Sequence, residues 1–439
     1  MAGPSMKYPS TMGKDDSEYK SNDPRIPQGL RYAEGLVYQD LLQVAKQRKA
    51  AGVPPPQVVV ITDIMKDVDD LVAMVLLKDL HRLGLIVLKG FVANLKPART
   101  RALAAKGALN TLGLSDIPVG VGTDAQVVEV GKQPRKVSDY EFDMCPFIAP
   151  SNTHLEDGFD LLTKLCKDAK RTGKKLTFLL ISGLRDINNF AKAHPDLLAA
   201  TAEKFVLQGG YRVEEKGGIQ DLVAAEDAAN NTFDIVAARE FHHYMAKRAI
   251  PSTSFTKLAA FATDIPEQLM IDLEESGHPV GKYLRKAQVL MDVDFYKSSC
   301  SPDPTKRFRP FMDQEWYLKN KSSYYQTPHP KGEPLPVGDE VIKYFNKLVA
   351  YDALAALAAG GDDVLKQLSI SRPTHGKKLH QVMGVAEVTG AQADPKKGIK
   401  AQAADTGING KPMAQAIRAL GCLFVTAIDV GGLATDGGV

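Results

Sequence analysis

Residues 58–70, Val-Val-Val-Ile-Thr-Asp-Ile-Met-Lys-Asp-Val-Asp-Asp, contain the two patterns that decide the fold. The first four residues form an uninterrupted β-branched run, which is typical of a strand buried on both faces of a parallel sheet. Residues 71–83 follow as an apolar-rich segment with the length of a helix. A buried strand that runs through acidic residues into a helix indicates the start of a βαβ unit.

The same alternation of strand and helix patterns continues on both sides of this stretch. Further strands are expected at residues 85–93, 117–121, 176–182 and 205–209. Further helices are expected at residues 32–49, 100–112 and 159–169, from residue 188 to 193, and at residues 339–357. This order predicts an α/β fold with a mostly parallel central sheet and helices on both faces.

The composition changes at both ends of the chain. Residues 1–30 are rich in Ser, Lys, Asp, Pro and Gly, and we expect them to be disordered. Residues 31–384 carry the strand and helix patterns and are expected to form the α/β domain. Residues 385–439 are rich in Gly, Ala and Lys, and are expected to be a C-terminal tail or appendage without an assigned structure.

Composition and charge exclude several classes of protein. The 439 residues carry a formal charge of only +3, which gives no reason to expect nucleic acid or an anionic membrane as a partner. The four cysteines contain no CxxC pair, so neither a zinc site nor a disulfide framework is expected. The polar N-terminus shows no signal peptide, and no run approaches the roughly 18 apolar residues of a membrane helix. A cytoplasmic protein is expected, and delivery into a host cell is left open.

Four aspartates lie within eight residues, at the point where the buried strand passes into the helix. They are Asp63, Asp67, Asp69 and Asp70. In open α/β sheets ligands bind at this edge, outside the carboxyl ends of the strands. The carboxylates repel one another there, and a hard cation such as calcium, which prefers oxygen ligands, would relieve the repulsion. Helix capping is the alternative, but it explains one or two aspartates better than four.

This segment resembles the aspartate motif of the inosine-uridine nucleoside hydrolases, which are calcium-dependent nucleoside N-ribohydrolases. The family pattern is Asp-x-Asp-x-x-x-Asp-Asp after the first strand, followed by an apolar helix. Four further segments of this chain occur in the family's order, at residues 91–94, 181–187, 208–234 and 350–355. The resemblance implies a Rossmann-like nucleoside hydrolase fold. It also implies calcium-dependent (Ca2+) hydrolysis of the N-ribosidic bond of a small nucleoside or nucleotide-like ligand, and a homo-oligomer is the common assembly in the family.

The resemblance also implies a role for each matching residue. The metal ligands would be Asp63, Asp67, Asp70, Asp352 and the backbone carbonyl of Ile181. The catalytic residues would be Asp63, Asp69 and Tyr351. The substrate would be held by Asp69, Asn94, Asn230 and Glu226, and Tyr211, next to the Gly209-Gly210 pair, is a candidate for stacking on the ligand or for core packing. An alignment without gaps places Met65 at the family's central aspartate, whereas a loop two residues longer places Asp63 there, with Asp67 as the alternative base.

The chain departs from the family pattern at three places. Ile64 and Met65 replace the usual Pro-Gly, so a different loop conformation is expected. Ala228 replaces the glutamate of the Glu-x-Asn pair, with Glu226 nearby. Tyr351 replaces a histidine before the last aspartate, and a phenol with a pKa near 10 is a slow general acid at neutral pH.

These departures resemble a branch of the family that contains the Xanthomonas outer protein Q type of effector, which has been linked to ADP-ribose-like ligands. The alternative function is therefore a catalytically impaired ribose- or ADP-ribose-binding protein that keeps the metal site. If the ligand carries phosphate, four arginines are candidates to contact it, although surface positions are the more common explanation. They are Arg82, Arg99, Arg101 and Arg185. His242 and His243 lie in a helical pattern and are expected at the surface.

Overall fold

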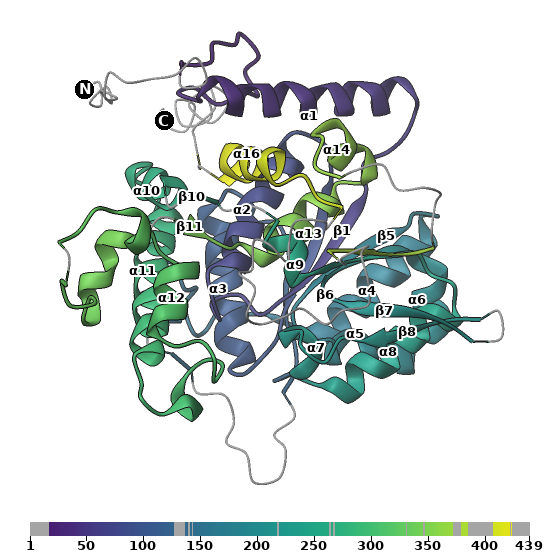
Figure 1. Ribbon diagram of the computed structural model, residues 1–439. Coiled ribbons are helices and arrows are strands. Elements are labelled where there is room, and N and C mark those ends of the chain that lie inside the picture. The colour runs from purple at the N-terminus through teal and green to yellow at the C-terminus, as the bar shows by residue number, and fades with distance from the viewer. Residues whose placement is uncertain are drawn as a thin grey trace.

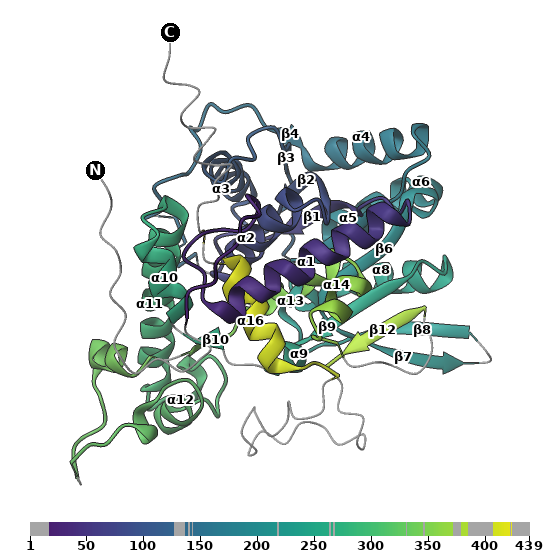
Figure 2. The ribbon, with the colours of Figure 1, turned by 90° about the horizontal axis from the view of Figure 1, so that it is seen from above.

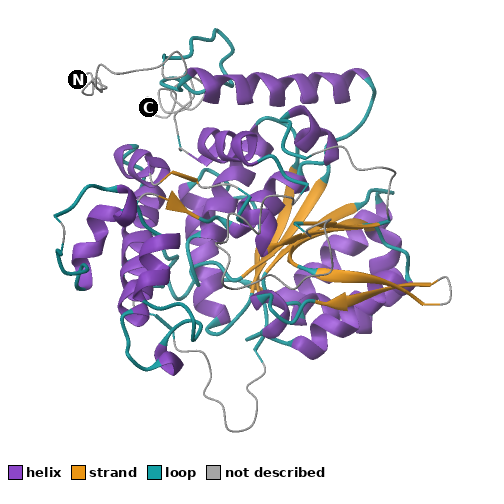
Figure 3. Cartoon of the chain, in the orientation of Figure 1, coloured by secondary structure: helices purple, strands orange, loops and turns teal. Residues whose placement is uncertain are grey.

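Strand β1, Gln57–Thr62, lies between β2 and β5 within an eight-stranded sheet of order β12-β9-β6-β5-β1-β2-β3-β4. The computed structural model describes residues 17–126, 137–138, 141–142, 144–216, 219–262, 265–266, 268–330, 332–345, 347–371, 379–384, 407–421 and 423. All neighbouring strands of this sheet run parallel, which confirms the expected α/β fold (Figure 3). Its other strands are β2 Val87–Ala93, β3 Val119–Val121, β4 Glu156–Asp157, β5 Leu176–Ile181, β6 Ala202–Gly209, β9 Ser252–Thr256 and β12 His380–Met383.

Helices cover both faces of the sheet (Figure 1). The α-helices are α1 Tyr32–Ala50, α2 Asp69–Arg82, α3 Ala98–Thr111, α4 Gly158–Arg171, α5 Arg185–Ala193, α6 Pro195–Thr201, α7 Ala229–Thr232, α8 Ile235–Lys247, α9 Lys257–Ala260, α10 Gln268–Glu275, α11 Pro279–Ser299, α12 Gln314–Asn320, α13 Tyr351–Ala359, α14 Asp362–Gln367 and α16 Gly410–Gly421. Short 3-10 helices occupy Pro304–Lys306, Tyr324–Gln326 and Gly338–Tyr344. Two antiparallel pairs lie outside the main sheet, namely β7 Tyr211–Lys216 with β8 Ile219–Ala224, and β10 Ile265–Pro266 with β11 Lys347–Leu348.

The alternation of side chains along β1 explains why its sequence is apolar throughout. Val58 and Val60 belong to one hydrophobic core, which includes residues of α1, α2, α3, α13 and α16. Val59 and Ile61 belong to a second core, which includes residues of α4, α5 and α8. Successive side chains of a strand point to opposite faces, so a strand covered on both faces needs apolar residues at every position.

The two ends of the chain contribute more to the core than their composition suggested. Tyr19 and Leu30 are buried, so the expected disorder does not extend to residues 17–30, and residues 1–16 lie outside the described residues. Helix α16 packs against α1 and α2 and buries Met413, Ile417 and Leu420. Figure 2 shows α16 alongside α1. The C-terminal segment therefore includes a helix of the main core.

The expected single helix over residues 339–357 is wrong. This region contains a 3-10 helix, Gly338–Tyr344, then β11, and then α13 from Tyr351. Because the chain breaks before Tyr351, α13 begins as a helix of its own, and Asp352 lies in its first turn. In the part of the chain that the structure describes, no helix combines the length and apolar character needed to cross a membrane.

Candidate metal centre

The ends of three neighbouring strands bring the predicted site segments to one edge of the sheet. Thr62 at the end of β1 pairs with Ala93 of β2 on one side and with Ile181 of β5 on the other. The residues that follow these strands, among them Asp63 and Asn94, therefore leave the sheet at the same edge. Ile181, predicted to offer its carbonyl to the metal, lies next to Thr62 in this register.

Two helix starts supply the other predicted carboxylates. Asp69 and Asp70 occupy the first turn of α2, and Asp352 occupies the first turn of α13, which packs against α2. All three are buried, as is Asp63. Backbone N–H groups at a helix N-terminus favour negative charge, so both helices partly offset the cost of burying these side chains.

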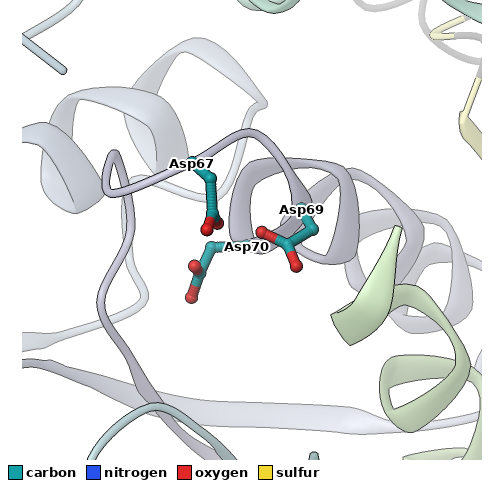
Figure 4. Close-up of side chains that lie close together, drawn as sticks. All are labelled: Asp67, Asp69 and Asp70. Atoms are coloured by element: carbon teal, nitrogen blue, oxygen red, sulfur yellow. The ribbon is translucent and has the colours of Figure 1, made fainter. Parts of the chain in front are cut away.

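The carboxylates of the aspartate loop gather in a small volume. Asp67, Asp69 and Asp70 each offer an oxygen atom, and these atoms lie within 4.8 Å of one another (Figure 4). Asp70 accepts a hydrogen bond from the Thr62 hydroxyl. Among the described residues, the buried Oδ1 of Asp69 has no hydrogen-bond partner. A buried acceptor beside two further carboxylates is what a hard cation would use as a ligand.

Burial and the charges of neighbouring aspartates raise the pKa of three carboxyl groups in the cluster. Burial, followed by the charges of Asp352 and Asp67, raises the pKa of Asp69 well above its ordinary value. Burial, followed by the charges of Asp63 and Asp352, raises the pKa of Asp70 in the same way. The pKa of Asp352 is raised by burial and by the charges of Asp67 and Asp63. Repulsion of this kind disfavours full ionisation unless a cation is present, so the donor set fits a divalent metal.

The loop between β1 and α2 keeps a conformation that usually requires glycine. Met65 has a φ of 77°, in the left-handed region, and Lys66 N–H donates to Asp63 O at 3.0 Å to close the turn. Met65 thus adopts a glycine-type φ itself, and the expected difference in loop conformation from the family stays a prediction. The Met65 side chain is buried in the hydrophobic core. This placement favours the alignment in which Asp63 is the central aspartate.

Arg101 has a role at this site that the sequence did not indicate. It was predicted as a phosphate contact or a surface residue, but its side chain is fully buried. Its guanidinium donates to the backbone carbonyls of Asp63 and Ile64 at 3.2 and 2.9 Å, and to Glu141 at 2.6 Å. It also donates to two carbonyls of the loop after β2, those of Leu95 and Lys96. Arg101 thus ties the aspartate loop to the neighbouring loop.

The other three candidate arginines are also engaged within the protein. Arg185 pairs with Asp234 at 2.6 Å, and Arg82 pairs with Asp79 at 3.0 Å. Arg99 donates to the carbonyl of Ser151. None of these contacts points to a phosphate site.

Asn94 is a structural residue in this arrangement. It was predicted to contact the substrate, but it is fully buried. Its amide nitrogen donates to the Gly183 carbonyl at 2.9 Å and to Asp186 at 2.8 Å, and its oxygen accepts from Ser182. Because both N–H groups are used within the protein, Asn94 fixes the loops after β2 and β5 and does not present its amide to a ligand.

The other three residues predicted to bind the substrate are Tyr211, Glu226 and Asn230, and each contacts another part of the protein. Tyr211 is buried in the second core, and its hydroxyl forms a 2.8 Å hydrogen bond with Ser252, so core packing is the correct alternative. Glu226 is largely exposed and pairs with Arg239, which gives its substrate role no support. Asn230 is half-buried and donates to the carbonyl of Gln208 at 3.0 Å, and its role stays a prediction.

Tyr351 lies near the cluster, as the sequence predicted. Its pKa is raised by burial and by the charges of Asp69 and Asp67, so its hydroxyl keeps its proton more firmly than an exposed tyrosine does. Its ring makes an edge contact with Phe261 at 5.5 Å between centroids. His242, by contrast, is buried and not at the surface, and it packs against the ring of Tyr211.

Two solved structures share the fold of this chain. No protein-family model matches this chain, and no curated protein matches it by sequence. The type III effector protein XopQ, solved in complex with adenosine diphosphate ribose, aligns with a TM-score of 0.71 and 22% identity over 90% of this chain and 100% of its own. The effector protein XOO4466 aligns with a TM-score of 0.65 and 21% identity over 89% of this chain and 99% of its own.

These two likenesses confirm the predicted fold, because almost the whole length of both chains superposes. A plant nucleoside hydrolase, PpNRh1, aligns over 84% of this chain at 13% identity with a TM-score of 0.48, a similarity too low to support an argument. The chain therefore has the fold of the XopQ type of effector, as the resemblance implied, and a shared fold does not by itself define an activity.

Proposed function

We propose that this protein binds calcium in the aspartate cluster and hydrolyses the N-ribosidic bond of a nucleoside or nucleotide-like ligand. The observation that carries the proposal is the convergence of five aspartates from one loop and two packed helix starts at the ligand-binding edge of a parallel sheet. Helix capping does not explain it, because Asp63 and Asp67 lie in the loop before α2, and neither α2 nor α13 has a side-chain hydrogen bond at its N-cap.

Each aspartate has a proposed task in this reaction. Asp63, Asp70 and Asp352, with Asp67 and the carbonyl of Ile181, would hold the ion, which supplies Lewis-acid activation of a water molecule when bound. Asp63 would accept the proton of that water, and Asp69, whose Oδ1 has no partner among the described residues, would accept hydrogen bonds from the ribose hydroxyls. The surrounding negative charge would stabilise an oxocarbenium-like sugar.

A second candidate function is binding of an ADP-ribose-like ligand without turnover. The specific observation that favours it is Tyr351, which stands at the position of the family's leaving-group histidine. Burial and the neighbouring carboxylates raise its pKa, so it donates a proton poorly at neutral pH. The complex of XopQ with adenosine diphosphate ribose makes that ligand the natural probe.

The test is calorimetric titration of the purified protein with calcium and then with ribose, adenosine and ADP-ribose, with chromatography of the products. Asp70→Asn is compared with Asp79→Asn, a buried aspartate nine positions further along α2, or roughly 13 Å along the helix axis. Loss of calcium binding and of base release in Asp70→Asn alone supports the hydrolase. Ligand binding without product supports the second function, and absence of calcium binding in the unaltered protein refutes the calcium-dependent hydrolase.

A further inference from the structure

Lys66 places a positive charge directly beside the aspartate cluster. Its ammonium lies 2.6 Å from Oδ2 of Asp67, and the charges of Asp63 and Asp69 also act on it. The side chain is about four-fifths buried, with 21% of its surface exposed. A lysine in the middle of a predicted metal loop is unexpected, because an ammonium has no acceptor and repels a divalent ion.

Two further contacts hold Lys66 in this position. Its backbone N–H donates to the carbonyl of Asp63, within the turn that Met65 closes in the left-handed conformation. Its ammonium lies 5.6 Å from the centre of the Phe233 ring, which comes from the segment between α7 and α8. An aromatic face attracts a cation over such a distance, so the ammonium is bracketed by Phe233 and the carboxylates.

We propose that the Lys66 ammonium is a built-in counter-ion of the aspartate cluster, and that it competes with the divalent cation for the same carboxylates. The inference rests on the proposed metal centre and adds a residue that controls its affinity. Lysine suits this task because its charge is compact and its four-carbon stem is flexible. The ammonium can therefore leave Asp67 when a metal ion needs that carboxylate.

The counter-ion has two consequences that a metal-binding loop without lysine would not have. Without metal, Lys66 offsets part of the repulsion among the five aspartates, so the metal-free fold is more stable than a cluster of carboxylates alone would allow. With metal, the ammonium must move away from Asp67, which weakens calcium binding. Lys66 thus lowers the affinity for the metal and raises the stability of the metal-free protein.

The experiment compares Lys66→Met, which keeps most of the length of the side chain and removes its charge, with Lys78→Met. Lys78 is a matched control on α2, because it also pairs with the aspartate that follows it, at 3.4 Å, and is 16% exposed. Calcium affinity is measured by calorimetry, and the melting temperature is measured with chelator and with calcium. We expect Lys66→Met to bind calcium at least tenfold more tightly than the unaltered protein, equivalent to about 1.4 kcal/mol. We also expect it to melt at a lower temperature than Lys78→Met in chelator.

The outcomes separate this inference from the proposed function. If the unaltered protein binds calcium and Lys66→Met binds it no more tightly, the counter-ion role is refuted while the metal centre stands. If only Lys66→Met binds calcium, the counter-ion role is supported, and the unaltered chain is shown to be blocked by its own lysine. Absence of binding in both refutes the metal centre together with the competition. An unchanged melting temperature of Lys66→Met in chelator also overturns the proposal.

Discussion

Replacing Arg101 by methionine tests whether this buried side chain holds the aspartate loop in place. The change removes hydrogen bonds to the carbonyls of Asp63 and Ile64, and it removes the 2.6 Å ion pair between Arg101 and the fully buried Glu141. Removing one member of a buried ion pair typically costs about 3–5 kcal/mol. For a chain of 439 residues, this lowers the melting temperature by roughly 3–5 °C.

Arg48→Met is the matched control for this experiment. Arg48 is also buried, donates to the carbonyls of Leu85 and Gly360, and pairs with Asp363. Its carboxylate partner is half-exposed, so water can solvate Asp363 after the change, and a smaller loss of about 1–3 kcal/mol is expected. The hydrogen bonds and the ion pair of Arg48 described above lie outside the aspartate loop, and its removal should leave calcium affinity within twofold.

Two measurements decide the outcome. Unfolding is followed by circular dichroism with increasing urea and temperature, and calcium affinity is followed by calorimetry at a temperature where each variant is folded. We expect Arg101→Met to lose at least tenfold in calcium affinity, because the backbone carbonyls of Asp63 and Ile64 are no longer anchored. A destabilised variant with unchanged calcium affinity would refute the positioning role, and a loss of stability below about 1 kcal/mol would refute the energetic reasoning.

Three further changes test other parts of the structure. Burial lowers the pKa of His242 to about 4 from its ordinary 6.5, so the neutral side chain contributes fully to stability above pH 6.5, and about 3 kcal/mol is lost as the pH falls to 4. His242→Phe should flatten that part of the curve of stability against pH. Parallel curves for the two proteins would contradict the lowered pKa. Met65→Gly relieves about 1–2 kcal/mol of left-handed backbone strain but loses a buried side chain worth about 2–5 kcal/mol, so urea unfolding should show a net loss of stability. A net gain would contradict the stabilising role of the buried Met65 side chain. Ile417→Ala in α16 should cost about 2–5 kcal/mol, whereas Lys411→Ala on its exposed side should cost under about 0.5; equal effects would show that α16 does not belong to the core.

The sequence alone determined the centre of the fold and the position of the acidic loop. A strand covered on both faces must be apolar at every position, and the helix after it must carry an apolar stripe, so β1 and α2 could be located from local pattern. The segments that follow β2 and β5 could be placed beside the aspartate loop, because the carboxyl ends of parallel strands lie at one edge of the sheet. That Asp352 joins the aspartates came from the resemblance to a known family, because nothing in the local pattern of α13 requires it.

Only the tertiary structure decided which side chains face the site. Asn94 and Tyr211 have the polar or aromatic character of ligand contacts, but hydrogen bonds and packing with distant segments direct them into the protein. Arg101 looks like a surface residue in sequence, and it is buried because the carbonyls of two loops and Glu141 satisfy its donors. Burial of a polar side chain depends on partners that are far away in sequence, and the local pattern carries no information about them.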